Sequence, residues 1–213
     1  MWWPFKKRKL KPIIIRGPVP NDFEKPISPV IIKGKVVDIQ VEGFENFTAE
    51  EKDFYLRALN LMLNAISSSF FKSELMTIPV KESNGLTRLE AYDKVMSGFD
   101  AYHKVVDHSL QFFFKLFYKR SSTIGYTNVG GFGISTNRYF VARWMKGKYG
   151  ECDLAGHIFH EYLHSVGFYH RWGHKGTLVY EWGYLARDVA IQIVDGKVVA
   201  LAEGLKEGVF FTA

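Results

Sequence analysis

The stretch that decides the fold is residues 160–170, HEYLHSVGFYH. On an α-helix, residues four apart lie one above the other, so His160 and His164 can offer two imidazoles to one metal ion. Glu161 points about 100° further round the helix, so it would lie beside a metal-bound water rather than on the metal. The spacing therefore predicts a helix that carries two metal ligands and a base.

A third ligand requires the helix to end. Gly167 tolerates the positive φ of a sharp turn at a helix C-terminus, and that turn can bring His170 back to the metal. Three neutral imidazoles leave a fourth position open for water, as in catalytic zinc sites. Zinc lowers the pKa of such a water toward about 7, so Glu161 can take its proton during attack on a carbonyl and pass it to the leaving amine. The complete pattern, HExxHxxGxxH, is that of a zinc-dependent peptidase.

Three other side chains compete for a place at the metal. His157 lies one turn before the motif, but three ligand positions are already filled. His174 is the rival of His170, and Gly167 favours His170 because it marks a turn at the expected distance. Glu181 would be the third ligand of a gluzincin-type site, which would leave Gly167 and His170 unexplained.

The motif resembles the active-site helix of the metzincin clan of metallopeptidases, and residues 123–127 and 133–137 are similar to the strands that precede that helix in compact members. Over roughly residues 30–190, the resemblance implies an α+β fold with a twisted mixed sheet, a backing helix and an active-site helix below a substrate cleft. In the clan, an antiparallel edge strand binds the substrate backbone by β-augmentation. The residues expected at this edge are Gly131, Phe132 and Gly133. A plain turn explains the glycines equally well.

The chain departs from the clan after its third histidine. Metzincins place a methionine in a tight turn beneath the metal, but all five methionines here precede the motif. Residues 177–184 occupy the place of that turn, so either another residue packs beneath the metal or the chain is a divergent, minimal relative. Some metzincins use a tyrosine from this region as an extra ligand or an oxyanion stabiliser, which makes Tyr180 and Tyr184 candidates. A role in the core or the substrate pocket is as good an interpretation for both.

Length and composition fit one globular domain, which we expect over residues 30–213. The chain has 213 residues, of which 47% are hydrophobic, enough to bury a core. No apolar run is long enough to cross a bilayer. The single cysteine, Cys152, excludes an intrachain disulfide, and we interpret it as a buried thiol.

Residues 1–29 form a basic, proline-rich arm. Residues 1–35 hold nine Lys and Arg against two acidic residues, so they carry +7 and the remainder carries −1. The prolines favour an extended arm, and the apolar run at 13–15 is too short for a signal peptide. Such an arm either docks on a partner protein, an anionic membrane surface or nucleic acid, or is simply solvated. Without a secretion signal or a membrane span, we expect a cytoplasmic or virion-associated protein.

Periodicity, capping boxes and turn residues predict the remaining elements. In chain order they are a strand at 30–41, a helix from the capping box at 48–51 to about 70, a strand at 75–80, a helix from the capping box at 87–90 to about 98, a buried strand at 110–118, the zinc-binding helix from its N-cap Asp153 to about Val166, a helical segment at 184–190 and an Asp-Gly hairpin at 191–199. For residues 110–118, periodicity alone leaves a helix as the alternative.

The sequence predicts a metalloendopeptidase that holds one Zn²⁺ through His160, His164 and His170, uses Glu161 as general base and acts on a protein or peptide. The alternative is a structural or interaction protein, for example a virion component, that keeps a metzincin-like fold without proteolytic use. The missing Met-turn and the lack of a recognisable propeptide favour this alternative. The intact Glu161 argues against it, because a structural zinc has no use for a general base.

Overall fold

The computed structural model describes residues 29–34, 36–81, 83–101, 104–131, 133–170 and 176–198. The predicted arm lies outside the described residues except for Pro29, and Phe132, His174 and Val199 lie outside them too. The described part of the chain is α+β, as predicted, with a five-stranded sheet, a two-stranded sheet and six helices.

The larger sheet mixes parallel and antiparallel pairs. Its strands, in spatial order, are β1 (Val30–Ile32), β2 (Asp38–Glu45), β5 (Ser109–Phe117), β7 (Ile134–Asn137) and β6 (Gly125–Tyr126). The three central strands are parallel, and the two edge strands are each antiparallel to their neighbour. The smaller sheet pairs β3 (Phe99–Asp100) with β4 (Val105–Val106).

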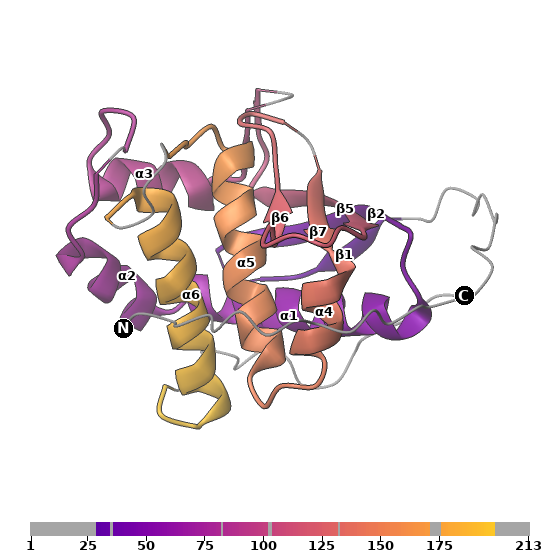
Figure 1. The fold of residues 1–213 in the computed structure, drawn as a ribbon. Coiled ribbons are helices and arrows are strands. Elements are labelled where there is room, and N and C mark those ends of the chain that lie inside the picture. Colours follow the sequence, from indigo (N-terminus) through magenta and orange to yellow (C-terminus); the bar gives the residue numbers. More distant parts are fainter. Residues whose placement is uncertain are drawn as a thin grey trace.

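The helices gather on one side of the larger sheet. They are α1 (Ala49–Ile66), α2 (Ser69–Thr77), α3 (Arg88–Met96), α4 (Arg138–Trp144), α5 (Gly150–Ser165) and α6 (Leu178–Val194). Figure 1 shows α5 and α6 side by side, with α1 running behind them and the sheet on the other side of α5. The helix that carries the HExxH sequence is thus held between the sheet, α1 and α6.

The core lies between α5, α1 and the central strand β5. The strand predicted at 110–118 is confirmed as β5, and alternate residues of it are buried, among them Phe112 and Phe114. The Phe112 ring lies 5.2 Å from that of Tyr162 on α5, and the Phe114 ring lies 5.1 Å from that of Tyr55 on α1. Burial of each phenylalanine stabilises the fold by about 1.5–3 kcal/mol. These contacts fix α5 against the sheet.

Several boundaries differ from the predictions. The strand predicted at 30–41 is instead two antiparallel strands, β1 and β2. The helix predicted to reach residue 70 ends at Ile66. The strand predicted at 75–80 is wrong, because residues 75–77 form the last turn of α2 and residues 78–80 lie in no strand. Ser68 starts α2 by accepting a hydrogen bond from the Phe71 amide, 3.0 Å away. Ser67 thus ends α1 and Ser68 begins α2, where a single helix to about residue 70 was predicted.

The predictions for the start of α5 and for the end of α6 were also wrong. Asp153 is not the N-cap of α5, which begins at Gly150; instead, the Asp153 carboxylate pairs with Arg187 of α6 at 2.6 Å. The hairpin predicted at 191–199 is wrong, because residues 191–194 form the last turn of α6. Gly196, at a φ of 69°, follows that turn, where an Asp-Gly sequence suits a helix end as well as a hairpin. Cys152 is buried, as predicted.

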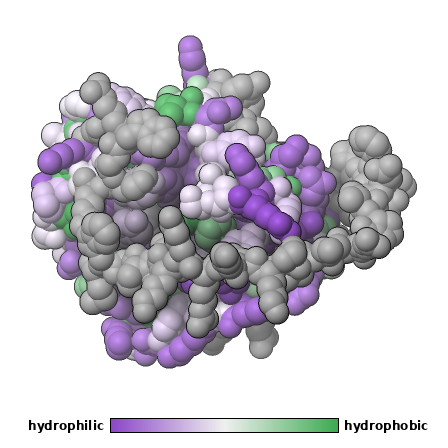
Figure 2. Space-filling model, viewed as in Figure 1, coloured by the Kyte–Doolittle hydropathy of each residue, from purple (hydrophilic) through white to green (hydrophobic). Residues whose placement is uncertain are grey.

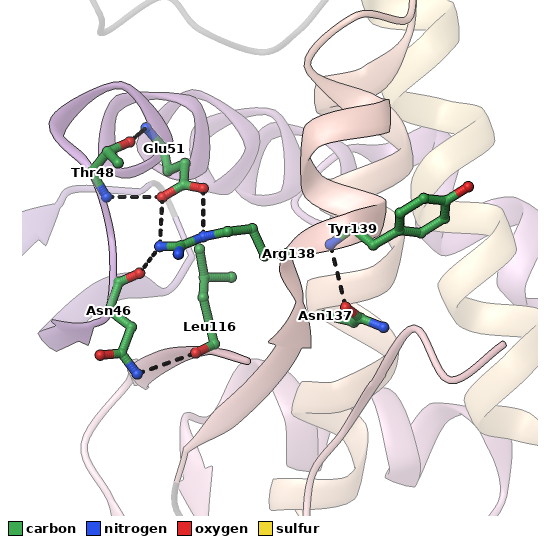
Figure 3. Close-up of polar contacts among 7 residues, drawn as sticks. All are labelled: Asn46, Thr48, Glu51, Leu116, Asn137, Arg138 and Tyr139. Carbon is green, nitrogen blue, oxygen red and sulfur yellow. Dashed lines mark hydrogen bonds and ion pairs between the residues drawn. The ribbon is translucent and has the colours of Figure 1, made fainter. Parts of the chain in front are cut away.

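An ion pair joins the start of α1 to the start of α4 (Figure 3). Both predicted capping boxes are present, and in the first the Glu51 carboxylate accepts a hydrogen bond from the Thr48 amide at 2.8 Å. The same carboxylate is buried and lies 2.9 Å from Nε and 3.1 Å from Nη2 of Arg138. Arg138 also donates to the carbonyl oxygen of Asn46. Glu51 therefore serves a helix cap and a tertiary contact together.

Replacing Glu51 with alanine is expected to lower the free energy of unfolding by about 2–4 kcal/mol, because it removes the cap and leaves Arg138 without its carboxylate. The matched control is Glu90→Ala in the second capping box, where Glu90 is exposed and hydrogen-bonds Thr87. Urea unfolding of both variants measures the difference. Equal losses would mean that the Arg138 contact adds nothing to stability.

Among the described helices, none combines the length and the apolar character needed to cross a bilayer. On the face seen in Figure 2, the described surface is mostly hydrophilic, and its hydrophobic parts are small.

Candidate metal centre

The three histidines of the motif come together at the C-terminal end of α5. His160 and His164 lie one turn apart on that helix, with ring centroids 5.2 Å apart. The ring of His170 lies 5.5 Å from that of His160 and 4.9 Å from that of His164. One nitrogen from each ring lies within 4.8 Å of the others. The predicted ligand set is therefore assembled.

A Schellman motif returns the chain to the site after α5. Gly167 has a φ of 104°, which favours glycine, and its amide donates to the His164 carbonyl at 2.9 Å. The Phe168 amide donates to the Leu163 carbonyl at 3.0 Å, which completes the motif. Phe168 is fully buried and anchors the turn. His170 follows two residues later, as the sequence predicts.

Backbone carbonyls orient the helix histidines. The Nδ1 atom of His164 lies 2.8 Å from the carbonyl oxygen of Phe168, so a proton on Nδ1 donates to this oxygen and Nε2 keeps its lone pair. Burial lowers the pKa of the His164 imidazole. Burial and the neighbouring imidazoles lower the pKa of His160, and a hydrogen bond with the Val179 backbone partly opposes them. Both rings are therefore neutral at pH 7, as metal ligands must be.

Glu161 lies beside this cluster with one oxygen unpartnered. Its side chain is almost completely buried, and burial raises the pKa of its carboxyl to about 8, with Thr127 acting in the opposite direction. The hydroxyl and the backbone N–H of Thr127 approach the carboxyl and oppose the effect of burial, but in the part of the chain that the structure describes no group makes a hydrogen bond of normal geometry to Oε2. A buried carboxylate oxygen without a partner is costly, so it is expected to serve a ligand or a water.

The three histidines fit a zinc ion. Nitrogens bound to one tetrahedral zinc at about 2.0–2.1 Å lie about 3.3 Å apart, so modest ring movements complete the geometry. The donor set is three imidazoles, and among the described residues no fourth His, Cys, Asp or Glu belongs to the cluster. Imidazole nitrogens also bind copper, nickel and iron, but a three-histidine site with a carboxylate beside it is typical of catalytic zinc.

Two of the three competing ligands, Glu181 and His157, are not part of the cluster. Glu181 is not among the clustered ligand groups, and its carboxylate accepts a hydrogen bond from the Gly176 amide at 2.9 Å. His157 is not among the clustered ligand groups, and its Nδ1 atom lies 3.7 Å from the Glu161 carboxylate. The alternative ligand His174 lies outside the described residues.

The two candidate tyrosines differ in their relation to the site. The ring of Tyr180 lies 4.5 Å from that of His160 and 4.6 Å from that of His170. Burial, with smaller effects of Tyr184 and Glu161, raises the pKa of Tyr180 to about 12. Tyr184 lies one turn further along α6, with 52% of its surface exposed and its ring 6.0 Å from that of Tyr180. Tyr180 therefore packs on the ligands, whereas Tyr184 lies further out.

The N-terminal part of α6 packs beside the histidine cluster, in the segment where the resemblance led us to expect a replacement for the metzincin methionine turn. Residues 177–184, expected to contain the replacement, are the N-cap and first turns of this helix. Helices α5 and α6 cross closely at two glycines, where a Cβ on Gly156 would lie 2.8 Å from the Gly183 carbonyl oxygen and 2.6 Å from Cβ of Arg187. A Cβ on Gly183 would lie 3.0 Å from Cβ of His160. This glycine pair was not predicted from the sequence, although glycine inside a helical pattern is a signal for close packing.

Alanine at Gly156 is expected to destabilise the fold by about 1–3 kcal/mol despite its better helix propensity, because its Cβ overlaps the backbone of α6. Gly183→Ala is the matched comparison, since its nearest contact is longer and involves His160. We expect a smaller loss of thermal stability there, together with weaker metal binding. Thermal melts with and without zinc measure both effects; a stabilised Gly156→Ala variant would contradict the close crossing.

The expected substrate strand is displaced from its predicted position. Gly131 and Gly133 lie in the connection between β6 and β7, not in a strand, and Phe132 lies outside the described residues. Of the two antiparallel edge strands, β6 (Gly125–Tyr126) is the one that pairs with β7, the last strand before α5 in the chain. The connection is tied to the metal centre, since the Gly130 amide donates to the His164 carbonyl at 2.8 Å. The glycines therefore belong to a turn, the alternative that the sequence left open.

No known family model matches the chain, and neither a curated protein nor a solved structure matches it.

Proposed function

We propose that the chain is a zinc-dependent metalloendopeptidase that resembles the metzincins. The observation that carries the proposal is the assembly of three histidine ligands next to a buried glutamate oxygen that has no described hydrogen-bond partner. A structural zinc site needs four protein ligands and no base. This cluster offers three ligands and a base, which favours hydrolysis.

Each residue of the site has a defined task in this proposal. His160, His164 and His170 would hold a zinc ion, which supplies a Lewis acid that acidifies water and polarises a peptide carbonyl. Glu161 takes a proton from the attacking water at its free oxygen and delivers it to the amine that leaves. Without a metal, the raised pKa of the Glu161 carboxyl keeps much of it protonated near neutral pH, which is the form that delivers a proton to the amine. Binding of a cation nearby would lower that pKa and favour the basic form.

Tyr180 is the better candidate for stabilising the oxyanion. Its ring packs on two of the three ligands, and its raised pKa keeps the hydroxyl protonated at neutral pH. A protonated hydroxyl can donate a hydrogen bond to developing negative charge. Tyr184 is more exposed and lies further from the ligands, which suits contact with the substrate.

The proposed substrate is a protein or peptide in an extended conformation. Strand β6 ends the sheet and is antiparallel to β7, so its outer edge can pair with a substrate backbone. The mixed sheet, the antiparallel edge strand and the helix that carries the ligands together support the likeness to metzincins. The methionine turn is the feature of the clan that this chain lacks.

Zinc content and cleavage of a mixed peptide library test the proposal when the wild-type chain is compared with Glu161→Ala. We expect zinc in both proteins and cleavage only in the wild type. Zinc in both without cleavage would favour the alternative of a structural or interaction protein. Absence of zinc from the wild type would overturn the proposal.

A further inference from the structure

His157 is a buried polar side chain to which the proposed reaction gives no role. It lies on α5 one turn before His160, and only 8% of its side chain is exposed. Its Nε2 atom lies 3.2 Å from Oγ1 of Thr136 on β7, and its Nδ1 atom lies 3.7 Å from Oε1 of Glu161. The imidazole therefore stands between the sheet and the proposed general base.

The surroundings of His157 restrict its ring. A Cβ on Gly125 would lie 2.6 Å from Cε1 and 2.7 Å from Nε2 of the ring, and 2.6 Å from the Ser135 carbonyl oxygen. The Trp144 ring lies 5.6 Å away, between centroids. Glycine at position 125 of the edge strand is thus what leaves room for the imidazole. The ring is held by β6, β7, α4 and α5 together.

The charge and the hydrogen bonds of His157 follow from this burial. Burial lowers the pKa of the imidazole to about 3, so the ring is neutral and carries one N–H. A lone pair on Nδ1 would face a carboxylate oxygen, whereas a proton there is attracted to it. The favoured tautomer therefore has its proton on Nδ1, and the Thr136 hydroxyl donates to Nε2. Thr136 is fully buried, so water does not compete for this contact.

We propose that His157 is a positioning residue, whose Nδ1–H holds Oε1 of Glu161 so that the unpartnered Oε2 faces the water that attacks the substrate. The distance of 3.7 Å is longer than a hydrogen bond, and a small rotation of the carboxylate closes it. Thr136 and Gly125 lie on β7 and β6, so the contact also ties the base to the proposed substrate strand. This inference rests on the proposed function.

The test is a double-mutant cycle on zinc-loaded protein with acetohydroxamate, a zinc chelator that also hydrogen-bonds a neighbouring carboxyl group. We expect His157→Phe to weaken acetohydroxamate binding about tenfold, and His157→Asn, which restores an N–H near Nδ1, to stay within about threefold of the wild type. In a Glu161→Gln background, His157→Phe should add less than about a twofold loss. Zinc affinity, measured against a chromophoric chelator, should change by less than about threefold in each variant, since His157 is not a ligand.

Equal losses from His157→Phe in the Glu161 and Glu161→Gln backgrounds would overturn the inference, and so would loss of zinc. If circular dichroism shows that His157→Phe is unfolded, Thr136→Val replaces it in the cycle, with an expected loss of about threefold that disappears in Glu161→Gln. If the wild type cleaves a peptide, His157→Phe should lower kcat for that peptide about thirtyfold at nearly constant KM. A wild type that cleaves nothing would refute the proposed function alone, because the acetohydroxamate cycle still decides for or against His157.

Discussion

Replacing Glu161 with glutamine is expected to lower kcat/KM for peptide hydrolysis by about 10³–10⁴-fold while zinc stays bound. Glutamine keeps the shape of the side chain and lacks the basic oxygen that takes a proton from water. The histidine ligands are untouched, so metal content should not change. Steady-state kinetics on a peptide that the wild type cleaves, together with zinc analysis of the same samples, measures both quantities.

The matched control is Glu181→Gln, which changes another glutamate near the start of α6. Its carboxylate binds the Gly176 amide and is not among the clustered ligand groups, so kcat/KM should fall by less than about fivefold. An equal loss in both variants would point to a general effect of charge. A Glu161→Gln enzyme with full activity would remove Glu161 from the reaction.

The histidine cluster could be predicted from sequence because its geometry is local. Helical periodicity fixes the relation of His160 to His164, and a single glycine with positive φ fixes the return of the chain. The hydrogen bond from His164 to the Phe168 carbonyl spans only four residues. Such short-range relations depend little on the rest of the fold, so the motif alone predicted which three histidines meet.

The surroundings of the ligands depend on contacts between distant segments. Gly183 contacts His160 only because α5 and α6 cross at two glycines, and the crossing distance is not encoded in either helix alone. The β6 edge was misplaced because residues 131–133 contain glycines suited to both a turn and a strand edge. The contact of His157 with Thr136 could not be predicted, because the two residues are 21 positions apart in sequence and meet only when β7 packs against α5.

Removing the third ligand should have the other large effect: His170→Ala is expected to weaken zinc binding by at least about 10³-fold, more than the 10–100-fold typical of losing a partner of a ligand. Two imidazoles from one helix would remain, and a two-ligand zinc site is much weaker than one with three ligands. Because His170 follows the turn at Gly167, its loss should leave α5 and the turn intact. Competition with a chromophoric chelator measures the affinity, and circular dichroism checks the fold.

The control that separates the two candidate ligands is His174→Ala. His170 lies in the histidine cluster, so this second variant should keep zinc affinity within about threefold of the wild type, because it removes no ligand. Equal zinc content in the two variants would contradict the assignment of His170. Loss of zinc only in His174→Ala would mean that the chain returns to the metal four residues later than the Schellman turn and the position of His170 indicate.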